Sequence, residues 1–90
     1  EERNLEVLIE VNPRAADYFR RRKIFPTQEI RETNPDGSLI VSLKVGHFGE
    51  VREILKSWLP NVRVLNPPDI KESFTAEIGK WLTWQGAPKR

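Results

Sequence analysis

The residues of this chain that could carry chemistry are a single histidine, thirteen carboxylates and a run of four cationic side chains. Nucleophilic catalysis needs a hydroxyl or thiol with a base within hydrogen-bonding reach, and the only imidazole, His47, stands between a predicted strand and a predicted helix. We interpret His47 as a capping or exposed turn residue, with a ligand contact as the alternative. The carboxylates stand mostly beside Lys or Arg, without the apolar setting that raises the pKa of a general acid. The pattern predicts no catalytic residue.

The residue types do not indicate a metal site or a cofactor site either. The chain has no cysteine, so it has neither a disulfide framework nor a thiolate site, and one histidine cannot build a zinc site alone. Its five glycines are isolated, so a phosphate-binding loop and a dinucleotide fingerprint are both absent. We therefore expect no metal, no cofactor and no enzymatic activity.

The cationic run is Arg20-Arg21-Arg22-Lys23. The formal net charge of +2 is too small to indicate nucleic-acid binding, so any such signal must lie in clustering. A run at the end of a helix is explained by the helix dipole without any function. The alternative is contact with phosphate or an acidic partner, for which Arg14, Arg21, Arg22 and Lys23 are the candidates.

The elements that must position these residues follow from periodicity and turn chemistry. Apolar residues alternate over residues 5–11, which predicts a strand, and Asn12-Pro13 then opens a helix that ends near Lys23. A polar strand over 27–33 and an apolar strand over 38–45 flank Asn34-Pro35-Asp36-Gly37, where Asp-Gly supplies the positive φ of a tight hairpin.

The second half of the chain repeats the alternation of helix and strand. Helical spacing of apolar residues predicts a helix over 48–59, followed by a short strand over 62–65. Asn66-Pro67 offers the cap of a last helix. That helix is expected to bury one stripe, formed by Ile70, Phe74, Ile78, Trp81 and Leu82.

The order is therefore βαββαβ with an additional C-terminal helix, a ferredoxin-like α/β fold of the α+β sandwich type. Right-handed crossovers place the first two helices on one face of a sheet with strand order 4-1-3-2. Residues 1–84 form one domain, and 85–90 are expected to be a flexible tail.

The opposite face of this sheet should be open. Single-stranded RNA is often bound there through aromatic side chains, but the outward positions of the two central strands hold no aromatic residue and include Glu6 and Glu10. The same face carries Leu8, Ile40 and Leu65, which we expect to align across three strands as a docking or dimer face; scattered, partly exposed apolar residues are the alternative.

The three tryptophans are predicted separately. Trp58 and Trp81 fall on helical apolar stripes and are expected in the core. Trp84 falls past the stripe, where it would either anchor the last helix or meet a partner.

No apolar run is long enough to span a bilayer, and residues 1–3 lack the order of a signal peptide. We expect a cytoplasmic protein without a membrane partner. The chain opens in charged residues shortly before a strong strand, as an excised domain would, so we expect a further portion upstream.

Several segments together resemble the C-terminal extension that follows the WYL domain of bacterial transcriptional regulators, the WCX domain. They are "VNPRAADYF", "FPTQEIRETNPDGSLIVSLKV", "VREILKSWL" and "VRVLNPPDIKESFTAEI", in the family's order. The resemblance covers about Leu5 to Leu82. It departs at Leu59-Pro60-Asn61, where the family usually has a phenylalanine-glycine pair.

The resemblance implies a DNA-binding regulator with an upstream winged helix and WYL sensor, in which this domain takes part in effector sensing and in the homodimer. The expected partners are the WYL domain of the same chain or a second subunit, and a single-stranded nucleic acid or nucleotide effector. A second hypothesis is an ACT-like sensor of a metabolic enzyme, although such sensors use a glycine-containing turn where this chain has Asn12-Pro13. A third is a free-standing single-stranded nucleic-acid binder, which the acidic open face disfavours.

Overall fold

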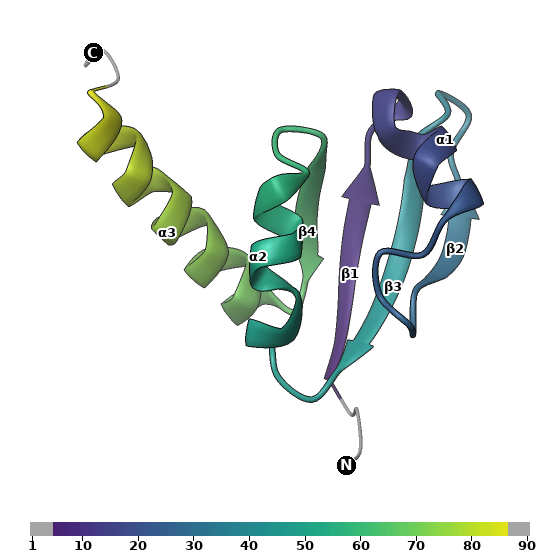
Figure 1. The fold of residues 1–90 in the computed structure, drawn as a ribbon, viewed down its shortest axis with the longest axis horizontal. Coiled ribbons are helices and arrows are strands. Elements are labelled where there is room, and N and C mark those ends of the chain that lie inside the picture. Colours follow the sequence, from purple (N-terminus) through teal and green to yellow (C-terminus); the bar gives the residue numbers. More distant parts are fainter. Residues whose placement is uncertain (1–4, 87–90) are drawn as a thin grey trace.

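The computed structural model describes residues 5–86 and places four antiparallel strands in the order β2-β3-β1-β4 (Figure 1). This is the predicted strand order, and the α+β, ferredoxin-like class with an additional C-terminal helix is confirmed. The elements are β1 (Leu5–Val11), α1 (Pro13–Arg21), β2 (Glu29–Thr33), β3 (Leu39–Val45), α2 (Gly49–Ser57), β4 (Val62–Asn66) and α3 (Pro68–Gln85).

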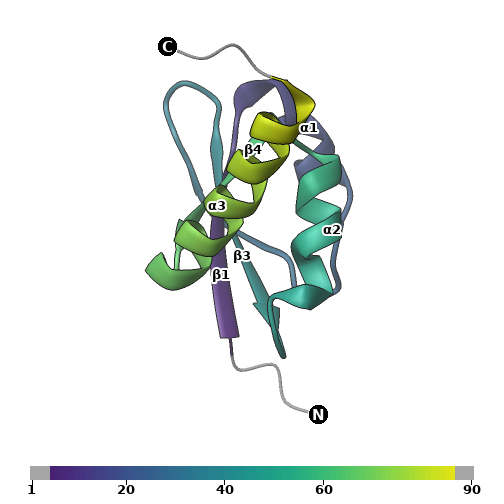
Figure 2. The same cartoon turned by 90° about the vertical axis from the view of Figure 1, so that its left-hand side faces the viewer.

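The helices α1 and α2 cover one face of the sheet, as Figures 1 and 2 show. Side chains of a strand alternate between the two faces of a sheet. The residues of β1 and β3 that point toward the helices pair with one another: Val7 lies opposite Leu43, and Ile9 opposite Val41. All four side chains are fully buried. The predicted alternation therefore sets the register of the central pair, because a slip by one residue would expose the whole apolar set.

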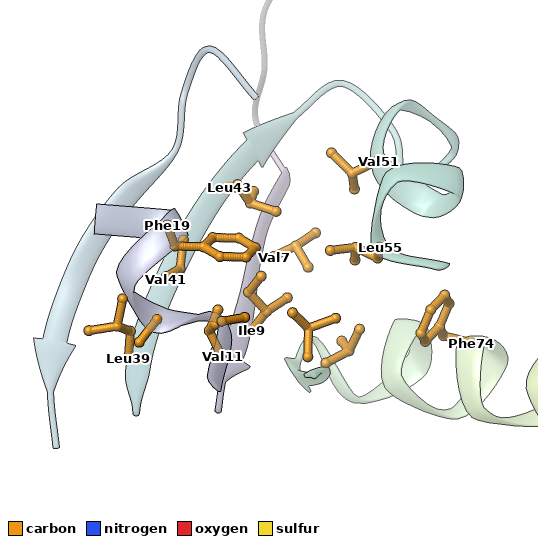
Figure 3. Close-up of a cluster of buried hydrophobic side chains, with 14 of the residues drawn as sticks. Val7, Ile9, Val11, Phe19, Leu39, Val41, Leu43, Val51, Leu55 and Phe74 are labelled. Carbon is orange, nitrogen blue, oxygen red and sulfur yellow. The ribbon is translucent and has the colours of Figure 1, made fainter. Parts of the chain in front are cut away.

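The core lies between this face and the helices (Figure 3). Phe19 projects from α1 over the sheet, and Val51 and Leu55 enter from α2. Trp58, predicted as core, packs at the edge of this cluster with its ring centroid 5.0 Å from that of Phe19. Burying one large apolar side chain stabilises the folded state by about 1.5–3 kcal/mol. This cluster is therefore the main source of stability.

The hairpin between β2 and β3 has the predicted geometry. Gly37 has φ +96°, and its N–H donates to the carbonyl of Asn34 at 2.9 Å. The backbone N–H and the hydroxyl of Ser38 donate to the Asp36 carboxylate at 2.9 and 2.7 Å, and these bonds lower the pKa of Asp36. The turn is thus closed by its own side chains.

Several boundaries differ from the predictions; the second helix, for example, spans Gly49–Ser57 instead of 48–59. The first helix ends at Arg21, two residues early, and Arg22 is extended with φ −135°. The polar strand begins at Glu29 because the Thr27 hydroxyl replaces a backbone partner, bonding both the N–H and the carbonyl of Lys44. The last helix begins at Pro68, and Asn66 belongs to β4.

The last helix departs most from expectation. It runs through Gln85, and Gly86 caps it in the left-handed conformation with φ 92°, so the residues expected to begin a tail are helical or capping. Residues 87–90 of that tail lie outside the described residues. Figure 1 shows the second half of α3 diverging from α2 and β4. Trp81 and Leu82, predicted as buried, are 50% and 46% exposed.

Candidate functional site

The start of α1 is fastened to the loop before β4. Asn12 caps the helix by accepting a hydrogen bond from the N–H of Ala15 at 3.3 Å. Its side-chain amide donates to the Asn61 side chain at 3.0 Å, and its backbone N–H donates to the Asn61 carbonyl at 2.9 Å. The turn after β1 is therefore closed by protein contacts, at the place where an ACT-like sensor would bind its ligand.

The end of α1 presents the cationic run. Arg20 and Arg21 occupy the last helical turn, where the partial negative charge of the helix C-terminus stabilises them. Both approach Asp17, with an Arg21 Nη2 to Asp17 Oδ2 distance of 2.7 Å. Arg22 and Lys23 lie beyond the helix and make no ion pair with residues 5–86. Their side chains are exposed and keep their full charge available.

Gln28 holds this cationic segment in place. Its side-chain amide is buried and donates to the carbonyls of Phe19 and Arg22 at 3.0 and 3.2 Å, while its oxygen accepts from the N–H of Ile24 at 2.7 Å. Pairing these backbone groups with a side chain avoids the cost of leaving them unbonded where water is excluded. The sequence analysis assigned Gln28 no role, although Gln28 lies in the segment "FPTQEIRETNPDGSLIVSLKV", which carries part of the family resemblance.

The resulting surface is a shallow depression of about 350 Å³. It is lined by residues from the end of α1, the connection and the start of β2, namely Phe19, Arg20, Arg21, Arg22, Lys23, Gln28, Glu29 and Ile30. Three of the four predicted phosphate candidates therefore converge here, and Arg20 joins them. Arg14 does not, because it stands in the first turn of α1 and outside the depression. We name Arg20–Lys23 the basic rim.

The open face of the sheet is crossed by ion pairs. Glu6 accepts hydrogen bonds from the buried Ser42 hydroxyl at 2.7 Å and from Arg31 at 2.6 Å, and these partners, Ser42 first, lower the pKa of Glu6. Glu10 pairs with Arg63 on β4, the two side chains 2.6 Å apart. The Glu6–Ser42 and Glu10–Arg63 links join neighbouring strands, and the Glu6–Arg31 pair reaches across β3 to β2.

The three apolar docking candidates do not form one row. Leu8 lies opposite Ser42 on β3, whereas Ile40 lies opposite Glu10, so the two occupy successive rungs. On β4 the register shifts at this level, and Leu65 stands between the partners of Leu8 and Ile9. All three are half-buried. The face is thus a mixed surface, with Leu8, Ile40 and Leu65 separated by paired charges.

The described residues that could serve catalysis or bind a metal do not gather in one place. His47 is exposed in the turn before α2, and its carbonyl accepts a hydrogen bond from the Glu50 N–H at 3.1 Å. Within residues 5–86, no three metal-ligating side chains lie together. None of the described helices is both long and apolar enough to cross a membrane.

The fold and these surfaces define a small α+β module of ferredoxin-like topology that exposes a cationic depression and scattered apolar side chains. The WCX domain family model matches residues 3–82, and the chain belongs to this family. A search of curated proteins found no significant match. WCX domains are C-terminal extensions of WYL-type regulators, so the chain belongs to a regulatory class of domain.

Proposed function

We propose that this domain is the effector-sensing and dimerisation module at the C-terminus of a bacterial WYL-type DNA-binding transcriptional regulator, and that it is not catalytic. The observation that carries the sensing role is the basic rim, three members of which were predicted as phosphate ligands. Four cationic side chains border one depression whose backbone is fixed by Gln28. The effector class that this chemistry favours is phosphate-bearing: a single-stranded nucleic acid or a nucleotide.

The positive charges of the basic rim favour anion binding and outweigh the unfavourable dipole of the helix end. The C-terminus of α1 repels an anion, but this effect is confined to the last turn. Asp17 partly neutralises Arg20 and Arg21, so Arg22 and Lys23 supply the uncompensated charge. Arginine binds phosphate through paired hydrogen bonds. We therefore assign the principal contact to Arg22, with Lys23 beside it.

The test is a titration of a labelled single-stranded oligonucleotide, and of a nucleoside triphosphate, at two salt concentrations. We expect Arg22→Glu to weaken binding about tenfold, the effect of losing one charged hydrogen bond. The slope of log affinity against log salt should fall by about 0.7 per lost phosphate contact. Lys80→Glu is the matched control, since it makes the same charge change on an exposed turn of α3.

Arg14→Glu sharpens the site further, because Arg14 stands outside the depression and should change affinity less than Arg22→Glu does. Two results would remove the phosphate role. One is absence of binding at high micromolar protein, and the other is an equal loss in Arg22→Glu and Lys80→Glu. Either would leave docking and dimerisation as the functions of the module.

We further propose that the open sheet face, with Leu8, Ile40 and Leu65, docks the WYL domain of the same chain or of a second subunit. The paired acids Glu6 and Glu10 support this role because they present little net charge to a neighbouring domain. Leu8→Glu should abolish binding of a separately supplied WYL domain in calorimetry. Glu32→Gln, at the exposed sheet edge, is the control that should bind normally.

A further inference from the structure

The two halves of α3 differ in what they contact. In the first half, Phe74 is buried with its ring centroid 5.7 Å from that of Phe48, and Ile70 and Ile78 pack against the core. Glu77 accepts a hydrogen bond from Lys56 on α2, which ties the middle of the helix to the domain. Beyond Ile78, every described residue of α3 is exposed.

The exposed half carries the largest apolar side chains on the surface. Trp84 is 83% exposed, Trp81 50% and Leu82 46%. Between this half and the rest of the domain lie two adjoining depressions of about 540 and 390 Å³, and both are lined by Leu59 and Ile78. Trp81 lines one depression and Leu82 the other. We name Leu59, Ile78, Trp81, Leu82 and Trp84 the overhang surface.

The exposed end of α3 has little tertiary packing to support it. Residues 79–85 continue a helix that is already nucleated in its packed first half, but every one of them is exposed. Gly79 and the β-branched Thr83 lower helix propensity further. A Cβ built at Gly79 would meet no atom within 4 Å, so this side of the helix is open to close approach. Something that covers the apolar side would stabilise the turns.

We propose that the overhang surface docks the overhang surface of a second copy of this chain, as a two-fold dimer. The surface contains a ridge, the end of α3, and a cleft, the two depressions beneath it, both built by the same helix. A two-fold axis therefore places each ridge in the partner's cleft. Such an isologous contact closes at two subunits and leaves no free copy of the surface.

The exposed apolar side chains provide about two-thirds of the area that such a contact needs. With aromatic side chains of about 150–250 Å², Trp81, Leu82 and Trp84 leave roughly 400 Å² uncovered. Both copies lose this area, so three side chains per copy supply about 800 Å² of the roughly 1,200 Å² that the smaller stable interfaces bury. The cleft walls supply the remainder.

The charges also favour self-association at this surface. The charged side chains that line the larger depression, Lys56 and Glu77, neutralise each other, and Arg52 approaches Glu77 at 3.9 Å. In the second depression Arg63 is paired with Glu10, so each copy adds one cation from the cleft walls, Lys71. The basic rim would behave oppositely, because two copies would oppose four cations to four.

This inference rests on the proposed function only for its dimerisation part, and it is tested on the complete chain. Light scattering and sedimentation equilibrium, from low to high micromolar, should show the mass rising from 10.5 kDa to twice that value. Trp84→Glu and Trp81→Glu should each weaken the dimer by more than about tenfold, as expected when a charge replaces a central tryptophan. Circular dichroism checks that both variants stay folded.

Ile30→Glu is the matched control, because Ile30 is an exposed apolar residue, 39% accessible, on the far edge strand. Its dimer should be as strong as that of the unaltered chain. Tryptophan emission gives a second readout: it should move to shorter wavelength as concentration rises, and Trp84→Phe should remove most of that movement.

Two results overturn the proposal. In one, the chain stays at 10.5 kDa at high micromolar concentration. In the other, it dimerises, but Leu8→Glu dissociates the dimer while Trp84→Glu does not, which moves the interface to the open face. Failure here is separable from failure of the sensing role, since Arg22→Glu should still dimerise and Trp84→Glu should still bind the oligonucleotide.

Discussion

The helix-covered face of the sheet and the second half of α3 both carry apolar stripes, but the first stripe is buried and the second is exposed. On the sheet, every inward residue of β3 is fully buried, from Leu39 to Val45. On α3, the stripe that begins with Phe74 is half exposed by Trp81. Periodicity shows which residues share a face, whereas burial requires another element opposite that face. The difference marks where the packed core of the domain ends.

The largest loss of stability should come from truncating a core side chain on the helix-covered face of the sheet. Phe19→Ala removes the ring that spans α1 and the sheet beside Trp58. We expect the free energy of unfolding to fall by about 3–5 kcal/mol, the range for a buried phenylalanine truncated to alanine. Urea titration measures it. A loss below about 1 kcal/mol would mean that the core does not depend on this ring.

A smaller loss should follow from removing a buried polar anchor on the same side of the sheet. Gln28→Met keeps the volume but leaves the carbonyls of Phe19 and Arg22 and the N–H of Ile24 without their bonds. We expect a cost of about 1–3 kcal/mol in the same titration, together with weaker oligonucleotide binding at the basic rim. Gln85→Met, on an exposed position, is the control. Equal stability of both variants would contradict the anchoring role.

Breaking the exposed stripe should cost almost nothing in the monomer. Trp81→Ala at low micromolar concentration should change the free energy of unfolding by no more than about 0.5 kcal/mol, as for surface substitutions. At high concentration the unaltered chain should become more stable, because association favours the folded state. Trp81→Ala should lose that gain. A concentration-independent stability of the unaltered chain would argue against the dimer.

The smallest effect concerns the point where the two halves of α3 meet. The hydrogen bond from Lys56 lowers the pKa of Glu77 below its ordinary 4.5, and Glu77 raises that of Lys56 above 10.5. The lowered acid contributes stability above pH 4.5 that is lost as pH falls through its folded value; the raised amine contributes below pH 10.5, and that contribution is lost at higher pH. Thermal unfolding of Glu77→Gln should therefore vary less with pH at both extremes. Matching profiles for Glu77→Gln and the unaltered chain would show that the pair adds nothing.

Much of the fold follows from local patterns in the chain. The alternation over β1 and β3 specifies which residues face the helices, because a β-strand has a period of two whatever surrounds it. The Asp36-Gly37 turn specifies the hairpin, since only glycine readily adopts its φ of +96°. The order of elements then leaves few topologies, because crossovers are right-handed. Strand order and the core of the sheet were predictable for this reason.

The candidate sites were less predictable, because they depend on distances between residues far apart in the chain. The cationic run was visible, but only the early end of α1 and the buried Gln28 bring Arg22 and Lys23 to one depression and leave Arg14 outside it. Leu8 and Ile40 were expected in one row, and the register set them on successive rungs. The sequence pattern indicates which face of the sheet a residue occupies, whereas the strand pairing decides which residues lie beside it.

The exposure of Trp81 and Leu82 was decided by the tertiary structure alone. A helical apolar stripe has the same spacing whether it meets its own domain or a partner. The length of α3 and its departure from β4 carry the last turns past α2, so residues with the spacing of a core become surface. That geometry, absent from any local pattern, turns the last helix into the most apolar surface among the described residues.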